Sequence, residues 1–149
     1  GKGEVPDDPD FSVPFGKADI KRKGTDVTIV ANLLYVGRAL EAAEELAGEG
    51  ISAEVIDPRT LVPMDMSTIT ESVKKTGRLV VVHEAHRTAG WGAEIASQVT
   101  EEAFPYLDAA PLRLGTAACP LPFNLELENA ATPQTADIIK AAKAVLYKE

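Results

Sequence analysis

The feature that most constrains the fold is the run Leu79-Val80-Val81-Val82-His83, in which four apolar residues follow one another without a polar interruption. A strand with one face in water would alternate apolar and polar side chains. An unbroken apolar run is typical of a strand that is covered on both faces, as in a parallel sheet. The run therefore predicts a sheet with helices on both sides.

The rest of the chain alternates between the two periodicities that such a fold needs. Strands are predicted at 27–31, 53–57 and 112–114, and helices at 35–49, 65–77 and from about residue 91 to Phe104. The last helix is predicted to be capped by Thr132 with Pro133 at its first position. Loops are expected at 84–90 and 117–133. This order predicts right-handed βαβ crossovers and an open α/β sheet.

Composition excludes several classes of function. Fifteen Lys and Arg against 23 Asp and Glu give a formal net charge of −8, which disfavours binding to nucleic acid or to an anionic membrane surface. The apolar runs are much shorter than the roughly 20 residues that cross a bilayer. The length of 149 residues fits one domain. Cys119 is the only cysteine, which fits a reducing compartment, and no export signal is recognised.

The first 16 residues contain prolines, glycines and acidic side chains but no helical or strand periodicity. They are predicted to form a linker or an extended arm. Phe11, Val13 and Phe15 alternate along it, so the arm could lie against another surface.

The richest candidate site follows the apolar run. In open α/β sheets, ligands bind outside the carboxyl ends of the strands. His83, Glu84, His86 and Arg87 bring both histidines, a carboxylate and a guanidinium to one strand end. They could bind a small anion or act in acid–base chemistry, but a polar loop whose groups satisfy one another is the favoured interpretation. The histidine spacing does not match the zinc motif His-Glu-x-x-His, and no metal site is predicted.

Other motifs give no catalytic or cofactor-binding residue. Gly90-Trp91-Gly92 follows a strand and opens a helix, but Ile95 occupies the position where a dinucleotide-binding motif has its third glycine. These glycines are better explained by a tight turn and close helix packing. Trp91 is either a core residue or an interface anchor. Cys119 has no neighbouring base in the sequence, so it is interpreted as a small apolar residue.

Several segments together resemble a known family. They are Gly16-Lys17-Ala18, Asp26 to Val30, Ala39 to Ala43, Glu54 to Asp57 with Arg59-Thr60-Leu61 and Pro63, Lys75 to Leu79, His83-Glu84-Ala85, Gly92 to Ile95, and Pro120-x-Pro122. Over about residues 1–147 the chain resembles the carboxyl-terminal domain of the transketolase family. Within it, the chain is most similar to the beta subunit of the decarboxylating component of 2-oxoacid dehydrogenase complexes, such as those for pyruvate, branched-chain 2-oxoacids or acetoin.

The resemblance implies a doubly wound, mainly parallel sheet of about five strands. It implies that 1–15 is a connector from a missing pyrimidine-binding domain and that 16–149 is the transketolase-like domain. Thiamine diphosphate and magnesium would belong to the complete enzyme, with none expected on this domain alone. The implied partners are an alpha subunit, a second beta subunit and the acyltransferase core, with a homodimer possible. The implied location is the bacterial cytoplasm, or the mitochondrial matrix in a eukaryote.

The leading hypothesis is therefore an assembly and partner-docking domain that is inactive alone. Phe11, Phe15, Trp91 and Phe123 are its candidate interface residues, with burial in the core as the alternative. A free-standing domain that binds a small anion through its strand-end loops is the second hypothesis. A complete small enzyme is the least favoured, because no nucleophile and base are paired.

Two departures from the family pattern accompany the resemblance. Relatives usually carry Asp where this chain has Ala118, which removes a carboxylate from the strand-end cluster. They usually carry Gly-Gly-Phe-Gly where this chain has Ala89-Gly90-Trp91-Gly92, which keeps an aromatic residue and the turn glycines.

Overall fold

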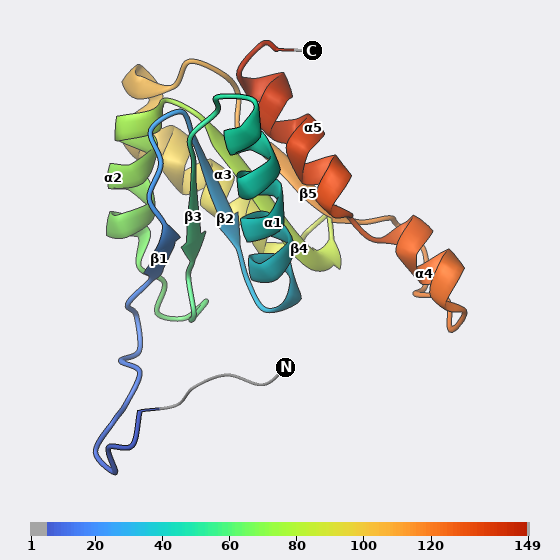
Figure 1. Cartoon of the computed structure of the whole chain (residues 1–149), viewed down its shortest axis with the longest axis horizontal. Helices are drawn as coiled ribbons and strands as arrows, with labels where there is room; N and C mark the ends of the chain where they lie inside the picture. The colour runs from blue at the N-terminus through green and yellow to red at the C-terminus, as the bar shows by residue number, and fades with distance from the viewer. Residues whose placement is uncertain (1–5, 149) are drawn as a thin grey trace.

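A five-stranded sheet forms the centre of the computed structural model, which describes residues 6–148 (Figure 1). The strand order is β1-β3-β2-β4-β5, with β1 antiparallel to β3 and the other neighbours parallel. The strands are β1 (Asp19–Arg22), β2 (Val27–Ala31), β3 (Ala53–Asp57), β4 (Leu79–His86) and β5 (Leu112–Thr116). The helices are α1 (Leu34–Gly48), α2 (Met66–Thr76), α3 (Trp91–Ala103), α4 (Leu125–Ala131) and α5 (Thr135–Val145), with a 3₁₀ turn at Phe104–Tyr106. This confirms the predicted doubly wound, mainly parallel sheet.

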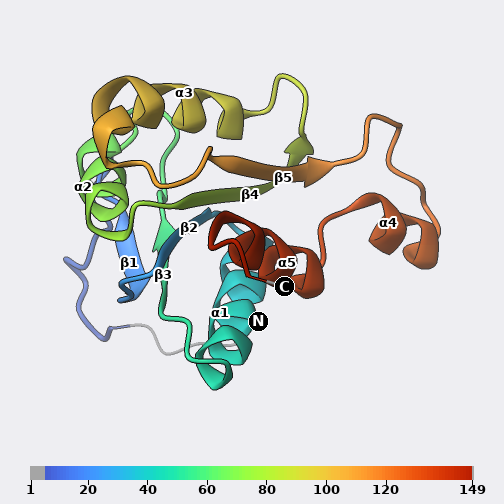
Figure 2. The same cartoon turned by 90° about the horizontal axis from the view of Figure 1, so that it is seen from above.

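Helices cover both faces of the sheet, as the unbroken apolar run of β4 requires. Figure 2 shows α2 and α3 on one face and α1 and α5 on the other. Successive residues of a strand point to opposite faces. Val80 and Val82 accordingly pack with α1 and α5, whereas Leu79 and Val81 pack with α2 and α3.

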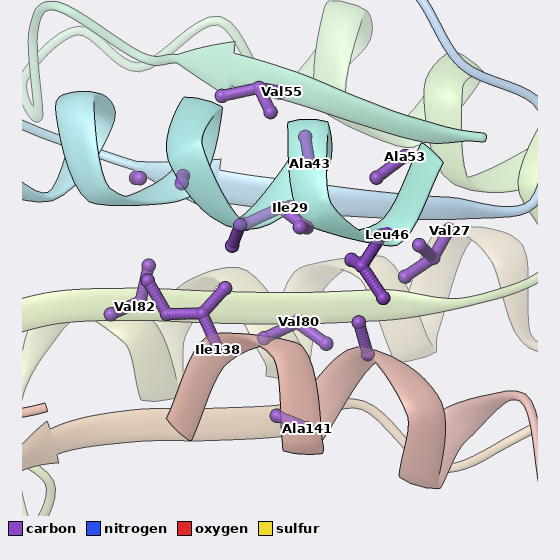
Figure 3. Packing of buried hydrophobic residues seen from close by; sticks show 14 of the residues in the cluster. Val27, Ile29, Ala43, Leu46, Ala53, Val55, Val80, Val82, Ile138 and Ala141 are labelled. Carbon is purple, nitrogen blue, oxygen red and sulfur yellow. The ribbon is translucent and has the colours of Figure 1, made fainter. Parts of the chain in front are cut away.

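The core beneath α1 and α5 shows this alternation directly. In Figure 3, Ile29 of β2 and Val80 of β4 lie between Leu46 of α1 and Ile138 of α5. All four side chains are fully buried. Burying a residue of this size is worth about 1.5 to 3 kcal/mol relative to leaving it exposed, so this layer fixes the two helices on the sheet.

The boundaries of α2 agree with the sequence prediction. The Asp65 side chain accepts a hydrogen bond from the backbone N–H of Thr68 at 3.2 Å, which caps the first turn. Gly77 ends the helix in the left-handed region at φ 70° and donates its N–H to the Val73 carbonyl oxygen at 2.7 Å. Such a glycine is a common helix terminator because it has no Cβ to clash.

A buried polar cluster joins α2 to the sheet. Thr28 of β2 hydrogen-bonds the hydroxyls of Ser72 and Thr76 at 2.7 and 2.8 Å. Glu54 of β3 accepts hydrogen bonds from Ser72 and Lys75 of α2. Every group in this cluster has a polar partner, so its burial need not destabilise the fold.

Three boundary predictions are wrong. The segment 84–90 is not all loop: β4 continues to His86, which pairs with Thr116 of β5 beyond an irregularity in the register. The segment 117–133 contains the short helix α4. Gln134, not Thr132, caps α5, because the Thr132 hydroxyl instead donates to the Glu128 carbonyl oxygen at the end of α4.

Strand β1 comes from the charged segment that the hydrophobic pattern did not assign as a strand. It lies at the edge of the sheet, where Asp19 forms ion pairs with Lys21 and Arg59 at 2.6 and 2.7 Å. Charged side chains on an edge strand oppose pairing with another sheet. Within residues 6–148, no helix is long and apolar enough to cross a membrane.

Candidate functional site

The carboxyl ends of β2, β3, β4 and β5 lie at one edge of the sheet. The chain passes from β2 to β3 on one side and then crosses to β4 on the other side of β2, so the winding direction changes beside β2. Ligand sites of this fold class form at the carboxyl edge near such a change. The predicted polar residues follow or end β4, at this edge.

His83 differs from its neighbours because its side chain is completely buried. Its Nδ1 atom lies 2.9 Å from the carbonyl oxygen of Ala85. A carbonyl oxygen can only accept, so Nδ1 donates the hydrogen bond and the neutral ring carries its proton there. The other ring nitrogen, Nε2, is buried and has no hydrogen-bond partner among the described residues.

Two glycines form the space that the His83 ring occupies, called here the glycine slot. A Cβ at Gly90 would lie 2.5 Å from Cε1 of His83, and a Cβ at Gly92 would lie 2.6 Å from its Cδ2. The Trp91 ring between them packs on the imidazole, with ring centroids 5.0 Å apart. Trp91 is half-buried against the core on the α2–α3 side of the sheet. The glycines therefore serve helix packing, as predicted, and the imidazole fills the space they leave.

Burial lowers the pKa of His83, and the nearby charge of Arg113 acts in the same direction, against the opposing effect of the hydrogen bond to Ala85. A buried imidazole with a lowered pKa is neutral at pH 7. His83 therefore lies in the core as a neutral residue.

We expect the NMR signals of His83 to titrate below the ordinary histidine pKa of 6.5. Because the unfolded chain takes up this proton more readily, the free energy of unfolding should decrease as the pH falls below 6.5 and continue to decrease until it passes the folded pKa. The reference is the titration midpoint of His83 measured in the urea-unfolded chain. A folded midpoint at or above the unfolded one would contradict the prediction.

The remaining polar residues face solvent. Glu84, His86 and Arg87 are exposed to solvent, whereas His83 of the same strand end is buried in the core. The Nδ1 atom of His86 lies 2.8 Å from the Ala117 carbonyl oxygen. The Arg87 backbone is held against β5, because its N–H donates to the Thr116 carbonyl oxygen and its own carbonyl oxygen accepts from the Arg113 side chain. The structure thus divides the predicted four-residue cluster in two.

A shallow cavity of about 460 Å³ lies beside His86. Its other lining residues are Thr88, Ala118, Cys119 and Pro120. None of the five lining residues is a carboxylate or a lysine or arginine. Ala118 therefore contributes only a methyl group to the wall of this cavity.

The four candidate interface residues do not form one patch. Phe11 and Phe15 are exposed on the arm before β1, and Phe123 is exposed in the segment between β5 and α4. Figures 1 and 2 both show these two segments at opposite sides of the molecule. The sequence pattern does not reveal the other exposed apolar side chains near Phe123, because a proline-rich loop is predicted there. They are Leu121, Leu125 and Leu127.

The topology and the carboxyl-edge loops define an open, doubly wound α/β domain. The family model described as "Transketolase, C-terminal domain" matches residues 16–138, most of this chain. The chain belongs to the transketolase C-terminal domain family.

Two of the similar curated proteins are named as beta subunits of a pyruvate dehydrogenase component. The chain is 50% identical over 141 residues to the pyruvate dehydrogenase E1 component subunit beta-2, mitochondrial, of Oryza sativa subsp. japonica. It is 47% identical over 145 residues to the pyruvate dehydrogenase E1 component subunit beta of Rhizobium meliloti (strain 1021). These alignments cover 95% and 97% of this chain but 38% and 32% of the relatives. The chain therefore spans about two fifths or less of their length.

Solved structures agree on the fold. A structure described as a split gene transketolase, inactive beta4 tetramer, has a TM-score of 0.78 and 32% identity, and covers 96% of this chain and 46% of that one. The 2-oxoglutarate:ferredoxin oxidoreductase from Magnetococcus marinus has a TM-score of 0.54 over 87% of this chain. Its 15% identity supports likeness of fold alone.

Proposed function

We propose that this chain is the carboxyl-terminal assembly domain of the beta subunit of a thiamine-diphosphate-dependent 2-oxoacid dehydrogenase. The observation that carries the proposal is the 50% identity to a pyruvate dehydrogenase beta subunit over 95% of this chain. In this role, the domain helps to join an alpha subunit and a second beta subunit and to dock the acyltransferase core. Pyruvate is the substrate class that the relatives' names favour.

The arrangement of polar groups in the chain supports an assembly role over cofactor binding. The glycine turn before α3 is occupied by the His83 ring, and Glu94 in the first turn of α3 places a negative charge where a phosphate would approach. Within residues 6–148, no group of three or more His, Cys, Asp or Glu side chains is arranged to hold a metal ion. These observations support the proposal that this domain does not itself hold thiamine diphosphate or its magnesium ion. In the proposed enzyme, other domains bind both groups.

The domain boundary and the location remain part of the proposal. Residues 1–15 would be the connector from a preceding pyrimidine-binding domain, although residues 1–5 lie outside the described part of the chain. Residues 16–149 would be the folded domain, of which Glu149 is also outside the described part. The name of the Oryza relative includes the word mitochondrial. By analogy, we place a eukaryotic version in the matrix and a bacterial one in the cytoplasm.

The first test is a calorimetric titration of this chain with thiamine diphosphate and Mg²⁺. We expect no saturable heat, because in residues 6–148 the glycine turn before α3 is filled by the His83 ring and no group of metal ligands is found. A dissociation constant in the micromolar range or tighter would overturn the assembly-only role. The Rhizobium meliloti enzyme, with its alpha subunit present, is the positive control.

A domain exchange tests the assembly role itself. Residues 16–138 of this chain would replace the corresponding segment of the Rhizobium meliloti beta subunit, which is then co-expressed with its alpha subunit. The chimera should form the complex and decarboxylate pyruvate. A matched chimera carrying the Oryza segment controls for the junctions. Assembly of the control without assembly of our chimera would contradict the proposal.

The alternative function, binding of a small anion by the strand-end loops, stays a prediction. Of its four residues, Glu84, His86 and Arg87 remain available at the surface, whereas His83 is buried. The exposed carboxylate of Glu84 would oppose an anion at Arg87. The assembly role therefore has the stronger support.

A further inference from the structure

A cavity of about 580 Å³ lies at the carboxyl edge of the sheet, where β2 and β3 end. It is called here the edge cavity. The loops that follow these two strands line it, together with β1 and the arm before β1. Its volume is in the range of ordinary small-molecule sites, and the carboxyl edge is where open α/β sheets bind ligands. Neither His86 nor Arg87 lines it, so it is distinct from the cavity beside His86.

The polar part of the lining has more positive than negative charge. Its members are Lys21, Asn32, Asp57 and Arg59. Two cations and one carboxylate give this lining one positive charge in excess, on a chain whose formal net charge is −8. Outside the lining, Lys21 Nζ and Arg59 Nη2 pair with the same oxygen of Asp19 at 2.6 and 2.7 Å. One carboxylate therefore serves both cations.

These side chains leave hydrogen-bond donors unused. An ammonium has three N–H donors and a guanidinium has five. Among the described residues, each of the two cations uses one donor, in its bond to Asp19. Asp57 already accepts the backbone N–H of Arg59 at 2.9 Å. Spare donors favour a ligand that supplies acceptors, and a single excess positive charge favours a monoanion over a doubly charged phosphate. A carboxylate is a monoanion whose two oxygens match a guanidinium.

The rest of the lining is apolar and partly open to water. Val13, Leu33 and Leu61 are lining residues, and their exposed fractions are 49%, 76% and 41%. Covering such side chains with an apolar group is favourable. Leu33 and Arg59 have φ angles of 50° and 58°, which are unfavourable for residues with a side chain and are often retained at ligand sites. The cavity therefore suits a ligand with an apolar body beside its charged head.

The arm before β1 forms part of the wall. Figure 1 shows the arm joining β1 at the edge of the sheet where β3 ends. The Gly16 N–H donates to the Thr60 hydroxyl oxygen at 3.0 Å, which ties the base of the arm to the loop after β3. Val13, three residues earlier, lines the cavity. A molecule in the cavity that contacts Val13 would hold the arm against the edge of the sheet.

We propose that the edge cavity binds a small monocarboxylate with an apolar body. The carboxylate accepts hydrogen bonds from the Lys21 and Arg59 side chains, and the apolar body packs on Leu33 and Leu61. The arm covers the bound molecule through Val13. This inference goes beyond the assembly role and does not depend on it, because the site needs no second subunit.

A titration of the unmodified chain with sodium hexanoate, followed by two-dimensional amide NMR, tests the site. We expect saturable shifts at Asn32, Leu33 and Arg59, with a dissociation constant in the millimolar range. Hexanamide has the same shape without the charge and should bind at least about tenfold more weakly. Butanoate, which is two methylenes shorter, should also bind about tenfold more weakly. The absence of saturable shifts, equal binding of hexanamide, or shifts centred on Arg87 would each overturn the inference.

Three variants assign the binding to the proposed side chains. Arg59→Met should raise the hexanoate dissociation constant by about tenfold or more, because a charge-assisted, bidentate contact is lost. Lys23→Met is the matched control, since it removes a positive charge just after β1 from a residue that does not line the cavity. Asp19→Asn should have the opposite effect and tighten binding, because a carboxylate that competes for Lys21 and Arg59 is removed.

The same NMR spectra show whether each variant is folded. If Asp19→Asn does not fold, the comparison of Arg59→Met with Lys23→Met still decides the question, because both replace exposed side chains. Equal affinity of these two variants would contradict the proposed site. Weaker binding by a folded Asp19→Asn variant would contradict it as well.

Discussion

Replacing Lys75 with Met should lower the free energy of unfolding by about 3 kcal/mol, the low end of the range for breaking a buried ion pair by removing one partner. Glu54, the carboxylate that Lys75 pairs with, is only 1% exposed. The variant would leave that charge in the core without its cation. The low end applies because the Lys75 side chain is 45% exposed, so water already weakens the pair.

The pKa of Glu54 explains how this loss would depend on pH. Burial by itself would raise the pKa, but hydrogen bonds from Lys75, Ser72 and the Gly24 N–H outweigh it and keep the pKa below 4.5. A carboxylate whose pKa is lower in the folded chain than in the unfolded chain stabilises the fold at pH values above the unfolded pKa. This stabilisation is lost as the pH falls through the folded pKa. Without Lys75 this acid-dependent loss should shrink, because less of the stabilisation is left to lose.

Urea denaturation of a small set of variants measures the effect. Lys74→Met is the matched control, because Lys74 pairs with Glu71 on the solvent side of the same helix and its loss should change stability little. Glu54→Gln/Lys75→Met should recover part of the loss, since a neutral amide can still bond Ser72. If Lys74→Met and Lys75→Met are equally stable, the ion pair between Glu54 and Lys75 does not contribute the expected stability.

Replacing Gly92 with Ala should lower the free energy of unfolding by about 2 kcal/mol, within the usual range for adding a methyl group to a packed core. The added Cβ would lie 2.6 and 2.7 Å from Cδ2 and Nε2 of His83 and 3.1 Å from Val81. The His83 ring cannot easily move aside, because it is fully buried and bonded to Ala85. Either α3 or the imidazole must therefore shift.

A double variant attributes this loss to the glycine slot. In His83→Ala/Gly92→Ala, the new methyl group occupies part of the space that the ring vacates, so the two losses should be less than additive. Gly37→Ala is the control: nothing lies within 4 Å of its Cβ position, and it lies inside α1, where Ala should stabilise the helix. Additive losses at positions 83 and 92 would mean that the slot is not the cause. Thermal and urea unfolding both provide the measurement.

The sequence predicted the core strands well, because they are the part of the chain where burial determines residue type. Both β2 and β3 begin and end at the predicted residues, since β2 is an apolar and β-branched run and β3 is a short segment around Val55 and Ile56 that Pro58 closes. The limits of α2 were predictable because Asp65 and Gly77 cap it through their own local chemistry. The unbroken apolar run correctly indicated a sheet with helices on both faces.

The strands and helices that were not predicted consist of residues that no local apolar pattern marks. Strand β1 is charged and is recognisable only from its pairing with β3. The last residues of β4 are exposed and join the sheet through Thr116. The helix α4 buries nothing, so no apolar periodicity marks it. The sequence also did not predict that His83 points into the core. Its ring fits there because Gly90 and Gly92 leave room for it, and no spacing rule relates these glycines to the histidine.

The reversed direction of β1 has a practical consequence for fusion proteins. Because β1 runs antiparallel to β3, the arm before it starts from the edge where the parallel strands end, and α5 finishes at the opposite end of the sheet (Figure 1). A reporter or affinity tag joined after α5 would lie at the end of the sheet opposite the carboxyl-edge loops. One joined directly before β1 would begin at the same end of the sheet as those loops, so the choice of terminus affects whether a labelled chain can report on binding there.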